Sequence, residues 1–204
     1  MEKWLKLAIE VQSIAQAGLT YTESVYDKER YERLREISAE MIAENSNLPV
    51  EKVKDLFCNE TGYQTPKMDT RGAIFKDDKI LLVHENNNTW SLPGGWQDVL
   101  ESVKSNTEKE VREEAGLNVK ATKVIALHDR NKHNPPPYPY GVCKIFVLCE
   151  LIDGEFKENS ETTETKYFSL DELPENLAIE KNTKAQIEMC FKAYKDPDWK
   201  CEFD

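Results

Sequence analysis

The sequence predicts a chain in two parts, an all-helical segment followed by an α/β domain. Before about residue 58, apolar residues recur every three or four positions, which is typical of amphipathic helices. From residue 68 they fall instead in short runs bounded by turn residues, which is typical of strands. We therefore expect a helical domain over residues 1–58, a linker over 59–67 and an α/β domain over 68–204.

Three helices are expected in the first part. The first begins at Trp4 and ends near Gly18, and the third follows Pro49, which suits the first turn of a helix. So short a segment makes a marginal core by itself, so its apolar stripes should pack on the second domain or on a partner chain. A homodimer through these helices is a hypothesis. The expected buried residues of the second and third helices are Tyr31, Leu34, Ile37, Met41, Ile42, Val53, Leu56 and Phe57.

The second part is predicted to begin with a hairpin and to end with a helix. Apolar and β-branched residues flank a polar turn at 76–79, which indicates two antiparallel strands. The last helix, over 183–194, would bury Ile187, Phe191 and Tyr194. The expected strands cover residues 71–75, 80–84, 119–127 and 142–151.

Composition excludes several classes of protein. The formal charge of −11 argues against a nucleic-acid surface, which would need a basic stripe, but bound cations could offset it around a small phosphorylated substrate. Five scattered cysteines without Cys-x-x-Cys spacing are typical of reduced thiols in a cytoplasmic protein. The first residues are charged and lead into no long apolar run, so we expect neither a signal peptide nor a membrane span.

The most informative segment places three acidic residues at helical spacing behind a glycine turn. Glu110, Glu113 and Glu114 stand at i, i+3 and i+4, so their carboxylates share one face of a helix. Like charges at this spacing destabilise a helix, unless a hard cation such as Mg²⁺ or Mn²⁺ binds their oxygens. Ser102 is a suitable N-cap for this helix, and Gly116 suits the left-handed position just past its end.

This segment resembles the Nudix box. The box consists of glycine, five residues, glutamate, seven residues, Arg-Glu, an apolar residue, any residue, Glu-Glu, any residue, glycine and an apolar residue. The resemblance implies an α/β/α sandwich with a mixed sheet, a Mg²⁺ or Mn²⁺ cofactor, and hydrolysis of a nucleoside diphosphate linked to another group. The helical first part is similar to that of bacterial members acting on ADP-ribose or CDP-choline. The fixed positions here are Gly95, Glu101, Lys109, Glu110, Glu113, Glu114 and Gly116.

Lys109 is the one departure from the box, because the family has arginine there. Lysine supplies the charge but lacks the planar two-point fork of a guanidinium. By resemblance, Lys109 should pair with Glu101, which leaves the other box glutamates to hold the metal. We expect this replacement to loosen the geometry without abolishing activity.

The resemblance also suggests the roles of the site residues. Glu110, Glu113 and Glu114 are the expected metal ligands, together with the backbone carbonyl of Gly95. Glu113 and Glu114 are also the expected catalytic residues of the box. A general base outside the box could be Glu161 or Glu164, although either could equally be an exposed loop acid. These two lie just before an aromatic strand and an Asp-Glu-Leu-Pro turn, as a glutamate often does in the family.

A long loop over residues 129–141 is the expected wall of the substrate site. Four prolines stiffen this loop between two strands, although it could also be an ordinary surface loop. Arg71 is a further phosphate candidate, with a structural ion pair as the alternative. His84 and His128 are assigned no role. The loop candidates are Arg130, Lys132 and His133 for phosphate, and Tyr138 or Tyr140 for stacking on a base.

Three functional classes are compatible with this pattern. The first is a metal-dependent hydrolase of the pyrophosphate bond, with a small nucleotide as its substrate. The second is a non-catalytic nucleotide sensor of the same fold, which the intact box glutamates disfavour. The third is an isomerase of isopentenyl diphosphate, which is disfavoured because the other metal-site features of that enzyme are absent from the sequence. The hydrolase is the prediction.

Overall fold

The computed structural model describes residues 2–139 and 141–204. It divides into two compact units, one formed by Met1–Pro66 with Pro137–Gly141 and the other by Lys67–Pro136 with Val142–Asp204. No helix in the described part of the chain is long and apolar enough to cross a membrane.

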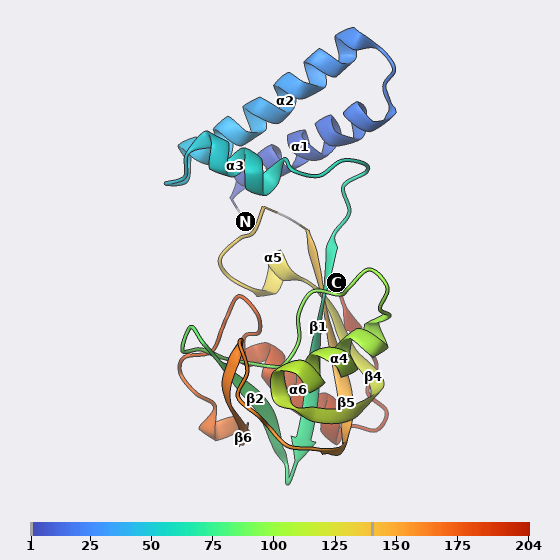
Figure 1. Cartoon of the computed structure of the whole chain (residues 1–204), viewed down its shortest axis with the longest axis vertical. Coiled ribbons are helices and arrows are strands. Elements are labelled where there is room, and N and C mark those ends of the chain that lie inside the picture. The colour runs from blue at the N-terminus through green and yellow to red at the C-terminus, as the bar shows by residue number, and fades with distance from the viewer. Residues whose placement is uncertain (1, 140) are drawn as a thin grey trace. The chain divides into compact units, whose positions relative to one another are not determined.

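The first unit contains α1 (Lys3–Tyr21), α2 (Val25–Glu44) and α3 (Val50–Phe57), drawn in blue to cyan in Figure 1. Helix α1 continues past Gly18, contrary to expectation. A Cβ at Gly18 would overlap the ring of Tyr31, so this glycine serves close helix packing and does not end the helix. Leu56 was expected to be buried but is 42% exposed. The core of the unit consists of Ala8, Ala39, Ile42, Val53 and Phe57.

The second unit is built on a mixed sheet of seven strands within the described residues. Its order is β3-β2-β1-β5-β4-β7, and β6 pairs with β2. The central pair, β1 and β5, is parallel, whereas β1–β2 and β4–β5 are antiparallel. The strands are β1 (Lys67–Lys76), β2 (Lys79–Glu85), β3 (Trp90–Ser91), β4 (Leu117–Asp129), β5 (Val142–Gly154), β6 (Thr162–Phe168) and β7 (Glu202–Phe203).

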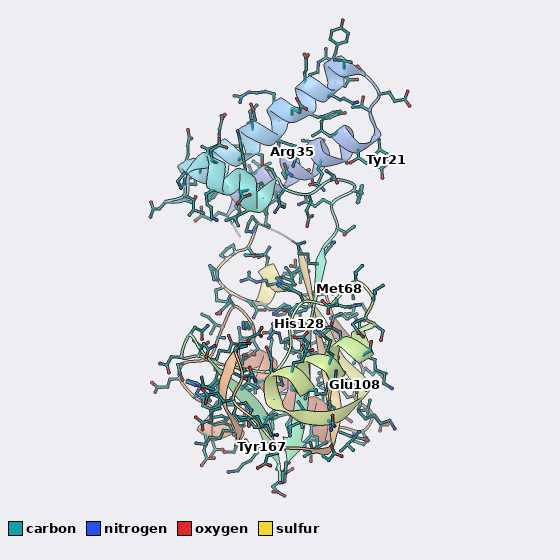
Figure 2. The ribbon with its side chains drawn as sticks, viewed as in Figure 1. Tyr21, Arg35, Met68, Glu108, His128 and Tyr167 are labelled. Carbon is teal, nitrogen blue, oxygen red and sulfur yellow. The ribbon has the colours of Figure 1, made fainter. Side chains whose placement is uncertain are left out.

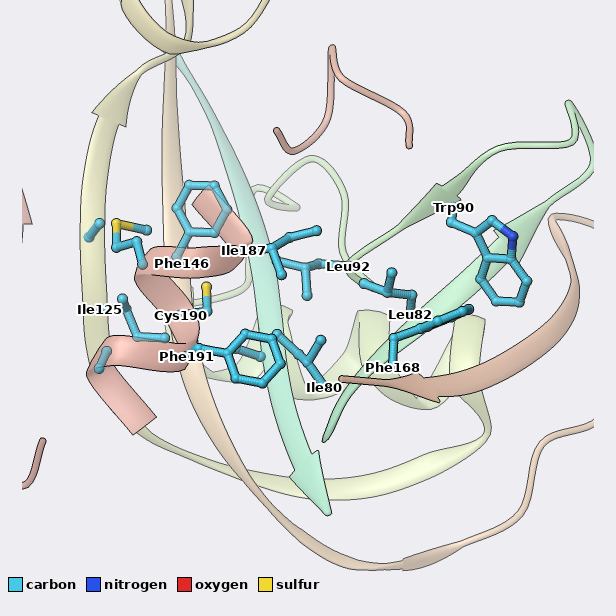
Figure 3. Packing of buried hydrophobic residues seen from close by; sticks show 14 residues of the cluster. Ile80, Leu82, Trp90, Leu92, Ile125, Phe146, Phe168, Ile187, Cys190 and Phe191 are labelled. Carbon is cyan, nitrogen blue, oxygen red and sulfur yellow. The ribbon is translucent and has the colours of Figure 1, made fainter. Parts of the chain in front are cut away.

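Two helices cover opposite faces of this sheet. Alternation along the strands sends Ile74 towards α4 (Val103–Ala115) and Ala73 towards α6 (Lys184–Lys195). Figure 3 shows the α6 side, where Ile187 and Phe191 pack over the sheet. Tyr194, expected to be buried, is 39% exposed. The predicted α/β/α sandwich after a helical segment is confirmed. A one-turn helix α5 (Arg130–His133) follows β4, and a short 3-10 helix spans Leu170–Glu172.

Candidate active site

Local signals fix both ends of α4, the helix that carries the acidic residues. Ser102 accepts a hydrogen bond from the backbone N–H of Ser105, whose hydroxyl in turn accepts from the backbone N–H of Ser102, forming a capping box. Gly116 ends the helix with φ of 68°, and a Cβ there would overlap the carbonyl of Glu155. Both caps agree with the sequence prediction, so the two ends of α4 follow from its own sequence.

A glycine turn lies directly against the carboxylates of α4. Gly94 has φ of 145°, and a Cβ there would overlap the Thr70 carbonyl in β1. A Cβ at Gly95 would lie only 2.6 Å from Oε2 of Glu110. The backbone N–H of Gly94 donates to Oε2 of Glu114 at 2.8 Å. Glycine is thus needed at 94 for its backbone conformation and its approach to β1, and at 95 for its approach to the Glu110 carboxylate.

The Gly95 carbonyl, expected to bind metal, already has a partner. It accepts a hydrogen bond from the backbone N–H of Thr70 at 2.9 Å. A carbonyl has a second lone pair, so a metal contact stays chemically possible. The observed partner nevertheless gives Gly95 a structural role in joining the turn to β1.

The three box glutamates differ in burial. Glu114 is 7% exposed, and burial raises its pKa to about 7 against the opposing charge of Arg71 and the Gly94 N–H. Burial also raises the pKa of Glu110, although its hydrogen bond from Lys109 works the other way. Glu113 has a side chain that is 54% exposed. A bound cation would therefore stabilise the charged form of Glu114 more than that of the other two carboxylates.

Lys109 contacts a different acid from the one expected. Its ammonium lies 2.9 Å from Asp98, and 3.3 Å from each of Glu110 and Glu113. The hydrogen bond to Asp98 is the main cause that raises the Lys109 pKa. The predicted pairing with Glu101 is wrong for the described side chains.

The cause of this difference is the loop ahead of α4. The backbone N–H of Asp98 donates to Oδ1 of Asn106 at 3.0 Å, which folds the loop back over the helix next to Lys109. Glu101 lies before the N-cap, eight residues and about two turns ahead of Lys109. The first turns of α4 therefore lie between Glu101 and Lys109, the pair that the sequence suggested.

Arg71 forms the structural ion pair that was the alternative to phosphate contact. It is 3% exposed and donates two hydrogen bonds to Asp69, at 2.8 and 2.7 Å. Its Nη1 donates to the carbonyl of Leu92 at 3.3 Å, just ahead of the glycine turn. Lys144 lies 3.1 Å from Asp69 on the other side, and burial lowers its pKa to about 8. The phosphate role expected for Arg71 is corrected, because its guanidinium is buried and already bound.

Two of the three charged loop candidates are also used within the fold. Arg130 is 7% exposed and donates to the carbonyl of Pro136 at 2.8 Å. His133 lies 2.5 Å from Asp204 and stacks on His128, with ring centroids 3.9 Å apart. These contacts shape the loop. The guanidinium of Arg130 is buried, which argues against a phosphate role, whereas the His133 side chain is 31% exposed and its phosphate role stays a prediction.

The other loop candidates remain open to different degrees. The Lys132 side chain is 58% exposed and 3.9 Å from Asp204, so it is available to a ligand. Tyr138 is grouped with the helical unit and has an interaction partner, so its stacking role stays a prediction. Tyr140 lies outside the described residues.

Both general-base candidates are exposed acids near the end of α4. Glu161 precedes β6 and Glu164 lies within it, opposite His84 of β2. The segment is attached to α4, because the hydroxyl of Thr162 donates to the Glu114 carbonyl at 2.6 Å. Figure 2 labels Tyr167 on this strand and Glu108 on α4. Proximity alone does not separate the two acids.

Sequence reasoning missed two charged residues near Glu114. Glu85 ends β2, is 8% exposed, and accepts a hydrogen bond from Ser91 at 2.6 Å. Lys181, ahead of α6, places its Nζ 2.5 Å from Oε2 of Glu85. No motif marks either residue, because their proximity depends on elements nearly 100 positions apart. The only available signal was a glutamate at the end of an apolar run.

The donor set fits a hard divalent cation. Oxygen ligands from Glu110, Glu113 and Glu114 are the type that Mg²⁺ and Mn²⁺ prefer. Within the described residues, no group of three or more His, Cys, Asp or Glu side chains could hold a metal ion, so the protein alone offers no metal cage. Mg²⁺ does not need one, because it usually keeps waters and substrate oxygens in its shell. The buried carboxylate of Glu114 beside a glycine turn supports a site that a cation completes.

A glycine turn packed against a row of helix carboxylates, inside an α/β/α sandwich, is suited to chemistry on phosphate groups. The chain belongs to the Nudix family. The NUDIX domain description matches residues 66–189, and residues 2–57 match the UDP-X-like N-terminal oligomerisation domain. The chain is therefore a Nudix hydrolase that cleaves the pyrophosphate bond of a nucleoside diphosphate linked to another group. Enzymes of this family generally need divalent cations.

Relatives cover both the whole chain and its second part. YjhB of Bacillus subtilis, provisionally named an ADP-ribose pyrophosphatase, is 43% identical over 203 residues, which are 99% of this chain and 97% of YjhB. A crystal structure of a UDP-X diphosphatase matches with a TM-score of 0.65 and 35% identity over 98% of each chain. An ADP-ribose pyrophosphatase from Streptococcus suis is 54% identical, with a TM-score of 0.64, over 69% of this chain and 100% of that one.

Proposed function

We propose that this hydrolase acts on ADP-ribose with Mg²⁺ or Mn²⁺, releasing AMP and a phosphorylated sugar. The observation that carries the proposal is the contact of the glycine turn with Glu110 and Glu114. The choice of ADP-ribose rests on the Streptococcus suis enzyme, which is 54% identical across its entire chain. CDP-choline, suggested by the helical segment, and UDP-linked compounds, suggested by the whole-chain likeness to a UDP-X diphosphatase, are the next candidates.

In this proposal Glu110, Glu113 and Glu114 hold the cation. When bound, the cation neutralises phosphate charge and lowers the pKa of a bound water. The Gly94 N–H orients Glu114 by its hydrogen bond of 2.8 Å, and Lys109 orients the other two acids by its contacts of 3.3 Å. The protein thereby orients three carboxylates before any cation arrives, with the buried Glu114 partly protonated near pH 7.

Glu161 or Glu164 is the proposed proton acceptor for the attacking water. The water oxygen forms a bond to one phosphorus, and the bond from that phosphorus to the bridging oxygen breaks. The proton of the water passes to the carboxylate, and the bridging oxygen leaves with the other phosphate. Both acids lie near the end of α4, because Thr162, next to Glu161 and two residues before Glu164, is bonded to the Glu114 carbonyl. Replacing each acid by glutamine separately would show which one lowers kcat.

The test is a hydrolysis assay on ADP-ribose, CDP-choline, UDP-glucose, NADH, diadenosine polyphosphates and nucleoside triphosphates. Each compound is incubated with Mg²⁺, with Mn²⁺ and with chelator, and the mononucleotide product is quantified. We expect ADP-ribose to give the highest kcat/KM, and chelator to abolish its cleavage. A higher value for a CDP- or UDP-linked compound would overturn the choice of substrate. Tight nucleotide binding without turnover of any compound would favour the sensor.

We also propose that the chain forms a homodimer through its N-terminal helices. Apolar side chains at seven-residue spacing stay exposed along α1, at Leu7 (44%), Ile14 (55%) and Tyr21 (71%). Such a stripe suits a second helix, and the matched family is described as an oligomerisation domain. Sedimentation of wild type and Ile14→Asp tests this idea, with the exposed Glu10→Gln as control. A monomeric wild type would refute it.

The cytoplasm is the proposed location. All five cysteines are free thiols, which is typical of proteins in a reducing compartment. Cell fractionation of the tagged protein would test this assignment.

A further inference from the structure

Lys181 is a partly exposed cation beside the candidate active site that no motif explains. Its side chain is 31% exposed, and its ammonium lies 2.5 Å from Oε2 of the buried Glu85. Oε1 of Glu85 accepts a hydrogen bond from the Ser91 hydroxyl at 2.6 Å, which fixes the carboxylate in place. Asn87 adds a longer contact of 3.5 Å to Oε2. Glu85 therefore holds the ammonium at a defined position while part of Lys181 remains open to solvent.

A second set of contacts places Lys181 next to the glycine turn. The adjacent Asn182 is fully buried, and its Oδ1 accepts the backbone N–H of Leu92 at 2.7 Å. Leu92 is two residues ahead of Gly94, whose own N–H binds Glu114. Asn182, next to Lys181, is thus bonded to the segment that leads from β3 into the turn. The charge of Lys181 also acts on the pKa of Glu114, which agrees with this short path.

The nearby cations are committed elsewhere. Arg71 and Lys144 are buried on Asp69, with exposures of 3% and 2%. Lys109 already contacts three acids on α4 and in the preceding loop. A pyrophosphate substrate carries at least two negative charges that the fold must accommodate in an acidic protein. Lys181 combines partial exposure with a position beside the turn.

We propose that Lys181 binds a phosphate oxygen of the substrate, and that Glu85 holds its ammonium in position when no substrate is present. This inference rests on the proposed function for the substrate class, a nucleoside diphosphate derivative. When the substrate binds, the Lys181 ammonium either exchanges its contact with the Glu85 carboxylate for one with a phosphate oxygen, or contacts both oxygens together. An ammonium has three donors, so it can serve both partners at once.

The test compares Lys181→Met, which keeps the length of the side chain, with Lys181→Arg, which keeps the charge. Lys79→Met is the matched control, because Lys79 forms a similar pair with Glu172 at 3.4 Å on the surface. Binding of ADP and of adenosine in the presence of Mg²⁺ is measured by calorimetry, and KM and kcat are measured on the best substrate. We expect Lys181→Met to weaken ADP binding and raise KM about tenfold, since a charge-assisted hydrogen bond is lost. Adenosine binding should not change.

Rescue separates a phosphate contact from a structural role. Lys181→Arg should restore ADP binding to within about threefold of wild type, whereas Lys79→Met should match wild type throughout. ADP binding by Lys181→Met equal to wild type would overturn the proposal, as would equal losses for ADP and adenosine. The ADP measurement needs no turnover, so it still decides the role of Lys181 if the proposed hydrolysis of ADP-ribose fails.

Discussion

Glu114→Gln should stabilise the metal-free protein at high pH while it abolishes activity. In the folded protein burial raises the Glu114 pKa to about 7, from an ordinary value of 4.5. A raised carboxyl pKa contributes stability that is fully present below the unfolded value and is lost as the pH rises through the folded value. The difference corresponds to about 3 kcal/mol, at about 1.4 kcal/mol for each pH unit. Glutamine stays neutral and retains an oxygen for the Gly94 N–H.

The assay is urea unfolding of wild type and variant with chelator, at pH 4.5 and at pH 8. The free energy of unfolding of the variant relative to wild type should rise by up to about 3 kcal/mol between these two values. Glu113→Gln is the control, because it makes the same chemical change one residue away on a side chain that is 54% exposed. A stability difference between Glu114→Gln and wild type that is constant with pH would refute the reasoning.

Glu114→Gln, which should stabilise the metal-free protein, should be harmful once the enzyme has to bind a cation. The charged carboxylate is the form that binds metal, so wild-type metal affinity should fall as the pH drops below about 7. Glu114→Gln should lack this pH dependence and should lose at least about 100-fold in kcat, equivalent to about 2.7 kcal/mol. Near-normal turnover in the variant would remove Glu114 from the metal site.

Three further predictions concern the neighbours of the site. Lys109→Arg should keep its contacts with nearby acids and leave kcat within about threefold of wild type in a steady-state assay; a collapse would mean that the guanidinium does not fit. Gly94→Ala should lower the free energy of unfolding by at least about 2 kcal/mol and abolish turnover, because φ of 145° and the Thr70 carbonyl both exclude a Cβ. Asp69→Ala should cost about 3–5 kcal/mol in urea unfolding, since two buried cations lose their counter-ion, whereas Lys144→Met should be neutral or stabilising. Equal losses for the last two variants would contradict this account.

Features set by neighbouring residues were predictable from the sequence. Ser102 and Gly116 end α4 as expected, because caps depend on a few adjacent residues. The β1–β2 hairpin also appears where turn residues separate two apolar runs. The box identified the glutamates and the glycine turn together, since its spacing encodes one helix and one loop.

Roles that depend on distant partners were not predictable. His133 contacts Asp204, which is 71 residues away in the sequence. Without knowledge of that contact, the availability of His133 to a phosphate could not be judged. Gly18 was interpreted as a helix end, but the ring of Tyr31 from the next helix requires it. Lys181 could be recognised as a candidate only from its contact with Glu85 in the structure, because no local pattern connects β2 to the segment before α6. Charged side chains in particular take their roles from whichever opposite charge the fold brings nearby.

The buried group of Asp69, Arg71 and Lys144 has a consequence for how the sheet assembles. Asp69 and Lys144 are direct partners in the parallel pairing of β1 with β5. A slip of one residue would turn Lys144 away from Asp69, its present counter-ion, and towards the largely apolar cluster between the sheet and α4. We infer that these charges act against misaligned sheets more than they add stability. Lys144→Met would then unfold at higher urea and yet show several amide-exchange populations in β5, whereas a single population would argue against this role.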